Sequence, residues 1–106
     1  EMALVIPAAV GYNSDLEMVE RVTIEVARET QQSVKGALPE FEPFIRFNTF
    51  GHSGVGFTVI LRVNEFTYQY LLKHEFVKAL HARFRKEGIE IPYPKRDIYI
   101  QRGKLG

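Results

Sequence analysis

The segment Val55–Val63 is the feature of this sequence that most restricts the fold. Apolar side chains at every second position alternate strictly with the residues between them: Val55, Phe57, Val59, Leu61 and Val63 against Gly56, Thr58, Ile60 and Arg62. Successive side chains of a strand point to opposite faces of a sheet, so this period of two predicts a β-strand with one buried face. The chain must therefore contain a sheet, and other segments must cover it.

Two neighbouring segments are expected to pair with this strand or extend its sheet. Phe44–Phe50 has strand character and precedes it across the four-residue loop Gly51–Gly54, which predicts a hairpin. Leu4–Val10 is rich in Val, Ile and Ala. Because proline cannot donate to a ladder, we expect Pro7 at the start of this strand or at a bulge, with pairing from Ala8 to Tyr12.

A last strand is expected over about Asp97–Gln101. The segment before it, Ile91-Pro92-Tyr93-Pro94, contains two prolines, which force the backbone into an extended path.

Two amphipathic helices are expected to cover the sheet. Ser14 and Glu17 have the spacing of a capping box, which predicts a helix over 15–33. A second helix is expected over 67–87, ended by Gly88 and Ile89 in a Schellman motif. The expected core positions are Leu16, Val19, Val22 or Thr23, Val26 and Ala27 in the first helix, and Tyr68, Leu72, Phe76, Ala79, Leu80 and Phe84 in the second.

The resulting order is βαββαβ in a chain of 106 residues, a length that suits one domain. This order predicts an α+β, ferredoxin-like fold: an antiparallel four-stranded sheet with two helices on one face. No stretch approaches the roughly 20 apolar residues of a spanning helix. Position 1 is Glu and the first Met is residue 2, so we expect the chain to be an excised piece of a longer protein or to carry a tag.

Charge is distributed unevenly along the chain. Residues 1–65 carry 5 Lys and Arg against 9 Asp and Glu, a net charge of −4, whereas residues 66–106 carry 9 against 4, a net charge of +5. A positively charged half can indicate nucleic-acid binding, although basic residues on the solvated face of a helix explain the same charge.

No catalytic, cofactor or metal site is expected. The chain has no cysteine, which excludes a thiolate zinc site, and fits a reducing compartment. His74 and His81 are seven residues apart, too far for the usual metal pair at i and i+4. His52 lies in the hairpin loop without an acidic partner placed to make a triad. We therefore expect the protein not to be an enzyme.

An RNA-recognition module has the same βαββαβ order and is the main alternative, together with a ferredoxin-like regulatory module. Gly54–Val59 partly matches the signature strand of such modules. However, Val55 stands where an aromatic residue should stack on a base, and Leu4–Val10 has no aromatic residue. We therefore expect no nucleic-acid partner.

Four segments resemble the lower cytoplasmic domain of the small-conductance mechanosensitive channel (MscS) family. They are Ile6–Asp15, Phe47–Phe57, Leu61–Val63 and, most specific, the run Gly88–Ile98 with its Gly-Ile-x-Ile-Pro-aromatic-Pro pattern. The residues that carry the motif, with structural roles, are Pro7, Tyr12, Asp15, Gly51, Ser53, Phe57, Arg62, Gly88, Pro92, Pro94, Arg96 and Asp97. Gly54, Asn64 and Lys95 depart from the family pattern, which leaves subunit contacts and local charge open.

The resemblance covers residues 4–101 as one cytoplasmic α/β domain, with 1–3 and 102–106 as tails. It implies a homo-heptameric channel in a bacterial- or archaeal-type inner or plasma membrane, whose cytoplasmic parts form a cage with lateral openings. Such a channel releases ions and small solutes on osmotic downshock. Its membrane helices would lie upstream, and this domain would supply a rigid wall, subunit contacts and charges along the ion pathway. Without those helices we expect a monomer or weak oligomer.

Overall fold

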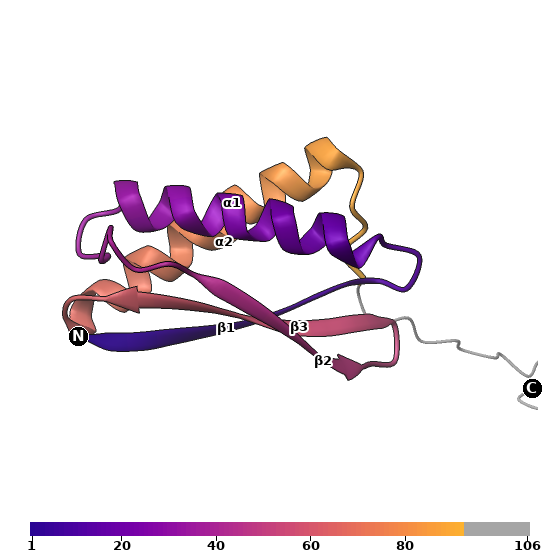
Figure 1. The fold of residues 1–106 in the computed structure, drawn as a ribbon, viewed down its shortest axis with the longest axis horizontal. Helices are drawn as coiled ribbons and strands as arrows, with labels where there is room; N and C mark the ends of the chain where they lie inside the picture. The colour runs from indigo at the N-terminus through magenta and orange to yellow at the C-terminus, as the bar shows by residue number, and fades with distance from the viewer. Residues whose placement is uncertain (93–106) are drawn as a thin grey trace, which may run out of the picture.

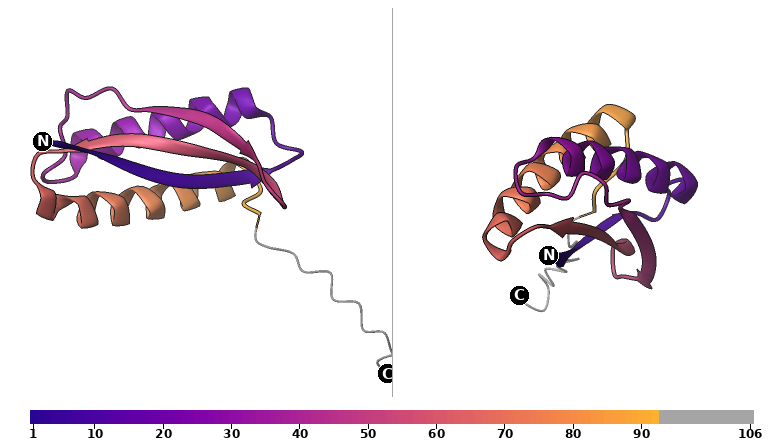
Figure 2. Two further views of the ribbon diagram at one scale, coloured as in Figure 1. Left: turned by 90° about the horizontal axis from the view of Figure 1, so that it is seen from below. Right: turned by 60° about the vertical axis from the view of Figure 1, so that its left-hand side comes forward.

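The structure is a computed structural model that describes residues 1–92. Three strands, β1 (Met2–Gly11), β2 (Phe44–Phe50) and β3 (Gly54–Val63), form an antiparallel sheet in the order β1-β3-β2. Helices α1 (Leu16–Ser33) and α2 (Gln69–Glu87) lie on the same face of this sheet (Figures 1 and 2). The α+β class and the two helices on one face are confirmed.

The number of strands differs from the expectation. The described sheet has three strands rather than four. The expected fourth strand, Asp97–Gln101, lies outside the described residues and stays a prediction.

Strand β3 is the central strand of the described sheet, and its strict alternation gives it one buried face. It pairs with β1 along its whole length, from Met2 opposite Val63 to Gly11 opposite Gly54. Its pairing with β2 contains a bulge between Phe47 and Thr49. A central strand has a neighbour on both sides and helices above it, so its alternate side chains are the most completely buried of the sheet.

The expectation for Pro7 was wrong. Pro7 lies inside β1, opposite Thr58, and the strand already begins at Met2. Strand β1 is an edge of the described sheet, and in an edge strand every second backbone nitrogen faces away from the neighbour. A proline at such a position removes no hydrogen bond of the ladder.

The helix ends follow the sequence closely, with one shift. Asp15, not Ser14, caps α1: its carboxylate accepts from the backbone N–H of Glu17 at 3.1 Å and of Met18 at 3.4 Å. A 3-10 turn, Phe66–Tyr68, leads into α2. At the other end of α2, Gly88 has a φ of 73°. The Ile89 N–H donates to the Phe84 carbonyl at 2.9 Å, which confirms the Schellman stop.

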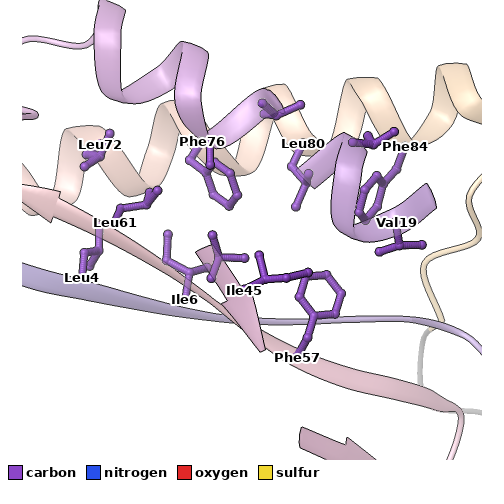
Figure 3. Packing of buried hydrophobic residues seen from close by; sticks show 14 of the residues in the cluster. Leu4, Ile6, Val19, Ile45, Phe57, Leu61, Leu72, Phe76, Leu80 and Phe84 are labelled. Atoms are coloured by element: carbon purple, nitrogen blue, oxygen red, sulfur yellow. The ribbon is translucent and has the colours of Figure 1, made fainter. Parts of the chain in front are cut away.

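The core fills the space between the sheet and the two helices (Figure 3). Strand side chains such as Ile6 and Leu61 face Phe76 and Phe84 of α2 and Val19 of α1, and all of them are buried. Ala79, expected in this core, is instead exposed, because it falls on the outer side of the narrow stripe that α2 buries: Leu72, Phe76, Leu80 and Phe84. Within residues 1–92, neither helix is long and apolar enough to cross a membrane.

Candidate functional site

Three of the four motif segments meet at one end of the sheet. The turn that follows β1, the β2–β3 hairpin and the segment Gly88–Pro92 come together there, although they are far apart in sequence (Figure 1). We call this region the junction. Its contacts are made mainly by backbone atoms, glycines and one tyrosine.

The first contact of the junction joins β1 to the segment after α2. The Gly11 N–H donates to the Glu90 carbonyl at 2.9 Å, and the Gly11 carbonyl accepts from the Ser14 N–H at 3.1 Å. A Cβ at Gly11 would lie 2.6 Å from Oε1 of Glu90. That atom is the end of a flexible side chain that can move aside, so the backbone hydrogen bond is the contact that joins this segment to the end of the strand.

The second contact joins the hairpin to both neighbours. The Tyr12 hydroxyl donates to the Gly51 carbonyl, and the Gly51 N–H donates to the Gly54 carbonyl at 2.8 Å. A Cβ at Gly54 would lie 2.1 Å from the Val10 carbonyl oxygen and 2.9 Å from Cγ of Pro92. Gly54, a departure from the family pattern, thus lets Pro92 pack against the hairpin.

The junction collects most of the motif residues that the structure describes. Asp15 caps α1 beside it, Ser53 is half-buried in the hairpin loop, and Gly88 ends α2. Pro7 lies further along β1. Pro94, Arg96 and Asp97 lie outside the described residues.

Phe57 serves the core and not a binding surface. Its side chain is 1% exposed, and its ring centroid lies 5.3 Å from that of Phe47 on the helix-covered side (Figure 3). A base-stacking aromatic residue must lie on the open face of the sheet. The β3 residues on that face are Gly56, Thr58, Ile60 and Arg62, none of them aromatic, so along β3 the stacking platform of an RNA-recognition module is missing.

Arg62, the remaining motif residue, lies near the opposite end of the sheet, where its backbone is tied to α1 by Gln31. The buried Gln31 amide donates to the carbonyls of Leu38 at 2.6 Å and Arg62 at 3.1 Å. The Arg62 N–H donates to Oε1 of Gln31 at 2.9 Å. The sequence offered a signal for this tie, because Gln31 follows Ala27 by four residues on the core face of α1.

One ion cluster joins the two helices. Arg83 of α2 donates to Glu87 at 2.8 Å and to Glu25 of α1 at 2.6 Å. The hydrogen bonds that Arg83 donates to Glu87 and Glu25 raise the pKa of the Arg83 guanidinium, and the bond from Arg83 lowers the pKa of the Glu87 carboxyl. The cluster fixes α1 against α2 at the surface, above the apolar core.

The histidines lie at the surface, and His74 is 3.9 Å from the carboxylate of Glu75, the next residue of α2. His52 is exposed in the hairpin loop, and His74 and His81 are exposed on α2. Among residues 1–92, no three His, Asp or Glu side chains cluster as metal ligands would. What the site can do, on this geometry, is hold backbone segments in fixed relation.

Comparison with known proteins agrees with the resemblance seen in the sequence. Residues 4–91 match the sequence model of the family described as the C-terminal domain of the mechanosensitive ion channel MscS. A small-conductance mechanosensitive channel of Helicobacter pylori (strain UM084) is 29% identical over 92 residues, which is 87% of this chain and 32% of that protein.

Solved structures share the fold. The closed-state crystal structure of Helicobacter pylori MscS has a TM-score of 0.69 at 22% identity, covering 94% of this chain and 38% of that chain. The cryo-EM structure of Arabidopsis thaliana MSL1 has a TM-score of 0.64 at 17% identity, covering 87% of this chain and 34% of that chain.

This chain spans about a third of the length of these relatives. Because the family model covers residues 4–91, most of the chain, the protein belongs to the MscS mechanosensitive ion channel family, within its C-terminal domain.

Proposed function

We propose that this domain is one wall segment of the cytoplasmic cage of a homo-heptameric mechanosensitive channel. The observation that carries the proposal is the family match over residues 4–91 in a chain that spans only about a third of its relatives. In this proposal membrane helices elsewhere in the protein sense tension and gate the pore. The cage admits ions and small solutes through lateral openings, and the channel relieves osmotic downshock.

The domain's part in this function is mechanical and electrostatic, without catalysis. The junction supports a mechanical role because it fixes the end of the sheet, the hairpin and the segment after α2 with backbone hydrogen bonds and close glycine contacts. Such contacts leave little room for hinge motion. The Gln31 tie does the same at the other end of the sheet.

The charged helix faces support an electrostatic role. Most basic residues of α2 are exposed, among them Lys73, Lys78 and Arg85. Fixed charges along an aqueous path raise the local concentration of counter-ions and so influence which ions pass.

A graft tests the proposal in cells. Residues 4–91 replace the matched part of the Helicobacter pylori channel, and the chimaera is expressed in cells that lack their own mechanosensitive channels. We expect survival of osmotic downshock close to that given by the unaltered channel. A chimaera that reaches the membrane intact but gives no more survival than an empty vector contradicts the proposal.

A further inference from the structure

An apolar groove lies between the outer side of β1 and helix α2. It has a volume of about 250 Å³ and is lined mostly by apolar side chains, among them Ile6, Pro7, Phe76, Val77, Leu80 and Ile91. Val77 and Ile91 on its rim are 47% and 41% exposed. Within residues 1–92, β1 pairs with a strand on one side only, and the groove lies along its other edge.

An exposed aromatic side chain lies on the opposite edge. Phe50 ends β2 and is 87% exposed, the most exposed large apolar side chain of the described residues. It pairs across the sheet with the buried Val55, which places it on the helix side, and it lies beside Leu16 at the start of α1. A phenyl ring held out at the end of a hairpin has the size and chemistry to enter an apolar groove.

The two edges also differ in charge. Helix α1, which lies over β2, carries four glutamates and two arginines, a net charge of −2, and its cap Asp15 adds another negative charge. Helix α2, on the β1 side, carries five Lys and Arg against two Glu, a net charge of +3. The view from below in Figure 2 shows the helices flanking opposite edges of the sheet. One edge is thus acidic with a protruding Phe, and the other is basic with an apolar groove.

We propose that a second copy of this chain occupies the groove, with Phe50 of one copy seated beside Val77 of the next. The contact rests on the proposed function, since it would be one of the side-to-side contacts of the cage. It is head-to-tail: each copy uses its α1–β2 edge toward one neighbour and its β1–α2 edge toward the other. A contact of this kind repeats from copy to copy and forms a ring when the rotation closes.

The contact is too small to hold copies together in dilute solution. Stable interfaces bury roughly 1,200–2,000 Å² in total, and one phenyl ring with a charged rim falls below that. The contact becomes effective where the copies are already held close, at effective concentrations on the order of millimolar. Opposite charge on the two edges sets the orientation and makes the contact sensitive to salt.

Disulfide cross-linking tests the proposal directly, because the chain has no cysteine. The variants are Phe50→Cys, Val77→Cys and the double variant, each oxidised at about 1 mM chain, the concentration range of a tethered pair. The double variant is expected to give a ladder of covalent multimers on a non-reducing gel. Each single variant alone stays monomeric, and an equal mixture of the two stops at the dimer. The ladder is expected to be lost in high salt.

The pair Phe50→Cys with Tyr70→Cys is the matched control. Tyr70 is exposed on the same helix, two turns before Val77, a shift of about 10 Å along the axis. A disulfide needs Cβ atoms roughly 3.5–4.5 Å apart, so this pair is expected to give no ladder. Near-native thermal unfolding of every variant ensures that a missing ladder is not a folding defect.

Several results would overturn the proposal. Equal ladders from both double variants indicate non-specific collision, and dimers from Phe50→Cys alone indicate a symmetric contact. A monomeric disulfide in Val77→Cys with Ile98→Cys indicates that the chain's own residues 93–106 fill the groove.

The graft separates this contact from the proposed function. Loss of downshock survival in the graft while the ladder forms would count against the proposed function and leave the contact standing.

Discussion

Replacing Gln31 by Leu tests the account of how the sheet is tied to α1. The buried Gln31 amide makes three hydrogen bonds, and the substitution removes all of them. The Leu38 carbonyl keeps the Phe41 N–H, at 3.0 Å, and the Arg62 carbonyl keeps the Leu38 N–H, at 3.3 Å. Only the Arg62 N–H loses its partner, and an unpaired buried donor costs about 1–3 kcal/mol.

The remaining terms partly cancel. The two lost bonds to carbonyls cost a few tenths of a kcal/mol to about 1 kcal/mol each, since each acceptor keeps a partner, and the leucine side chain returns roughly 1 kcal/mol of apolar burial. The net expectation is a loss of about 2 kcal/mol. For a domain of this size that lowers the melting temperature by roughly 8–16 °C.

Urea and thermal unfolding measure the effect, with Gln32→Leu as the matched control. Gln32 is the next residue of the same helix and is exposed, so its substitution should change stability by less than about 0.5 kcal/mol. A Gln31→Leu variant as stable as the Gln32→Leu variant would refute the reasoning, because the three hydrogen bonds would then contribute nothing measurable.

Further predictions concern the junction, the ion cluster and binding. Gly54→Ala should cost about 3 kcal/mol, because its Cβ meets the Val10 carbonyl, whereas Gly88→Ala, with open space but a positive φ, should cost about 1–2 kcal/mol in the same unfolding assay. Arg83 lowers the pKa of the Glu87 carboxyl in the folded protein. The ion pair therefore stabilises the fold fully at pH values above the ordinary pKa of a glutamate, and this stabilisation is lost as the pH falls through the lowered pKa of Glu87. The stability difference between the protein and Arg83→Met should therefore shrink below about pH 4, which unfolding across a pH series measures. RNA should bind weakly, without sequence preference and less as salt rises, and tight binding at physiological salt would contradict the account. Sedimentation equilibrium at low micromolar concentration should find a monomer or weak oligomer, and a persistent seven-fold species would show that this domain alone drives assembly.

The sequence predicted the elements that depend on local pattern. The alternation of Val55–Val63 identified a strand with one buried face, because only a half-buried strand needs period two, and Gly88 with Ile89 located the end of α2. The error at Pro7 has a different origin. Whether a strand is an edge strand depends on the order of the sheet, which no local pattern contains.

The sequence predicted which residues make up the junction but not that they lie together. Tyr12, Gly51 and Pro92 were identified through the family motif, yet their meeting at one end of the sheet follows from the pairing of β1 with β3. Gln31 was missed because a glutamine on a helix is usually solvated. Phe57 was placed on the buried face by the alternation of Val55–Val63, and its 1% exposure confirms that position.

Single-channel recording of the graft into the Helicobacter pylori channel tests the central claim most directly. If this domain is a wall of the cage and part of the ion path, the tension that opens the chimaera should match the unaltered channel. The conductance or the anion–cation preference should change, and should change again in a Lys78→Glu variant of the graft. An altered opening tension with unchanged conductance and selectivity in both chimaeras would contradict the claim.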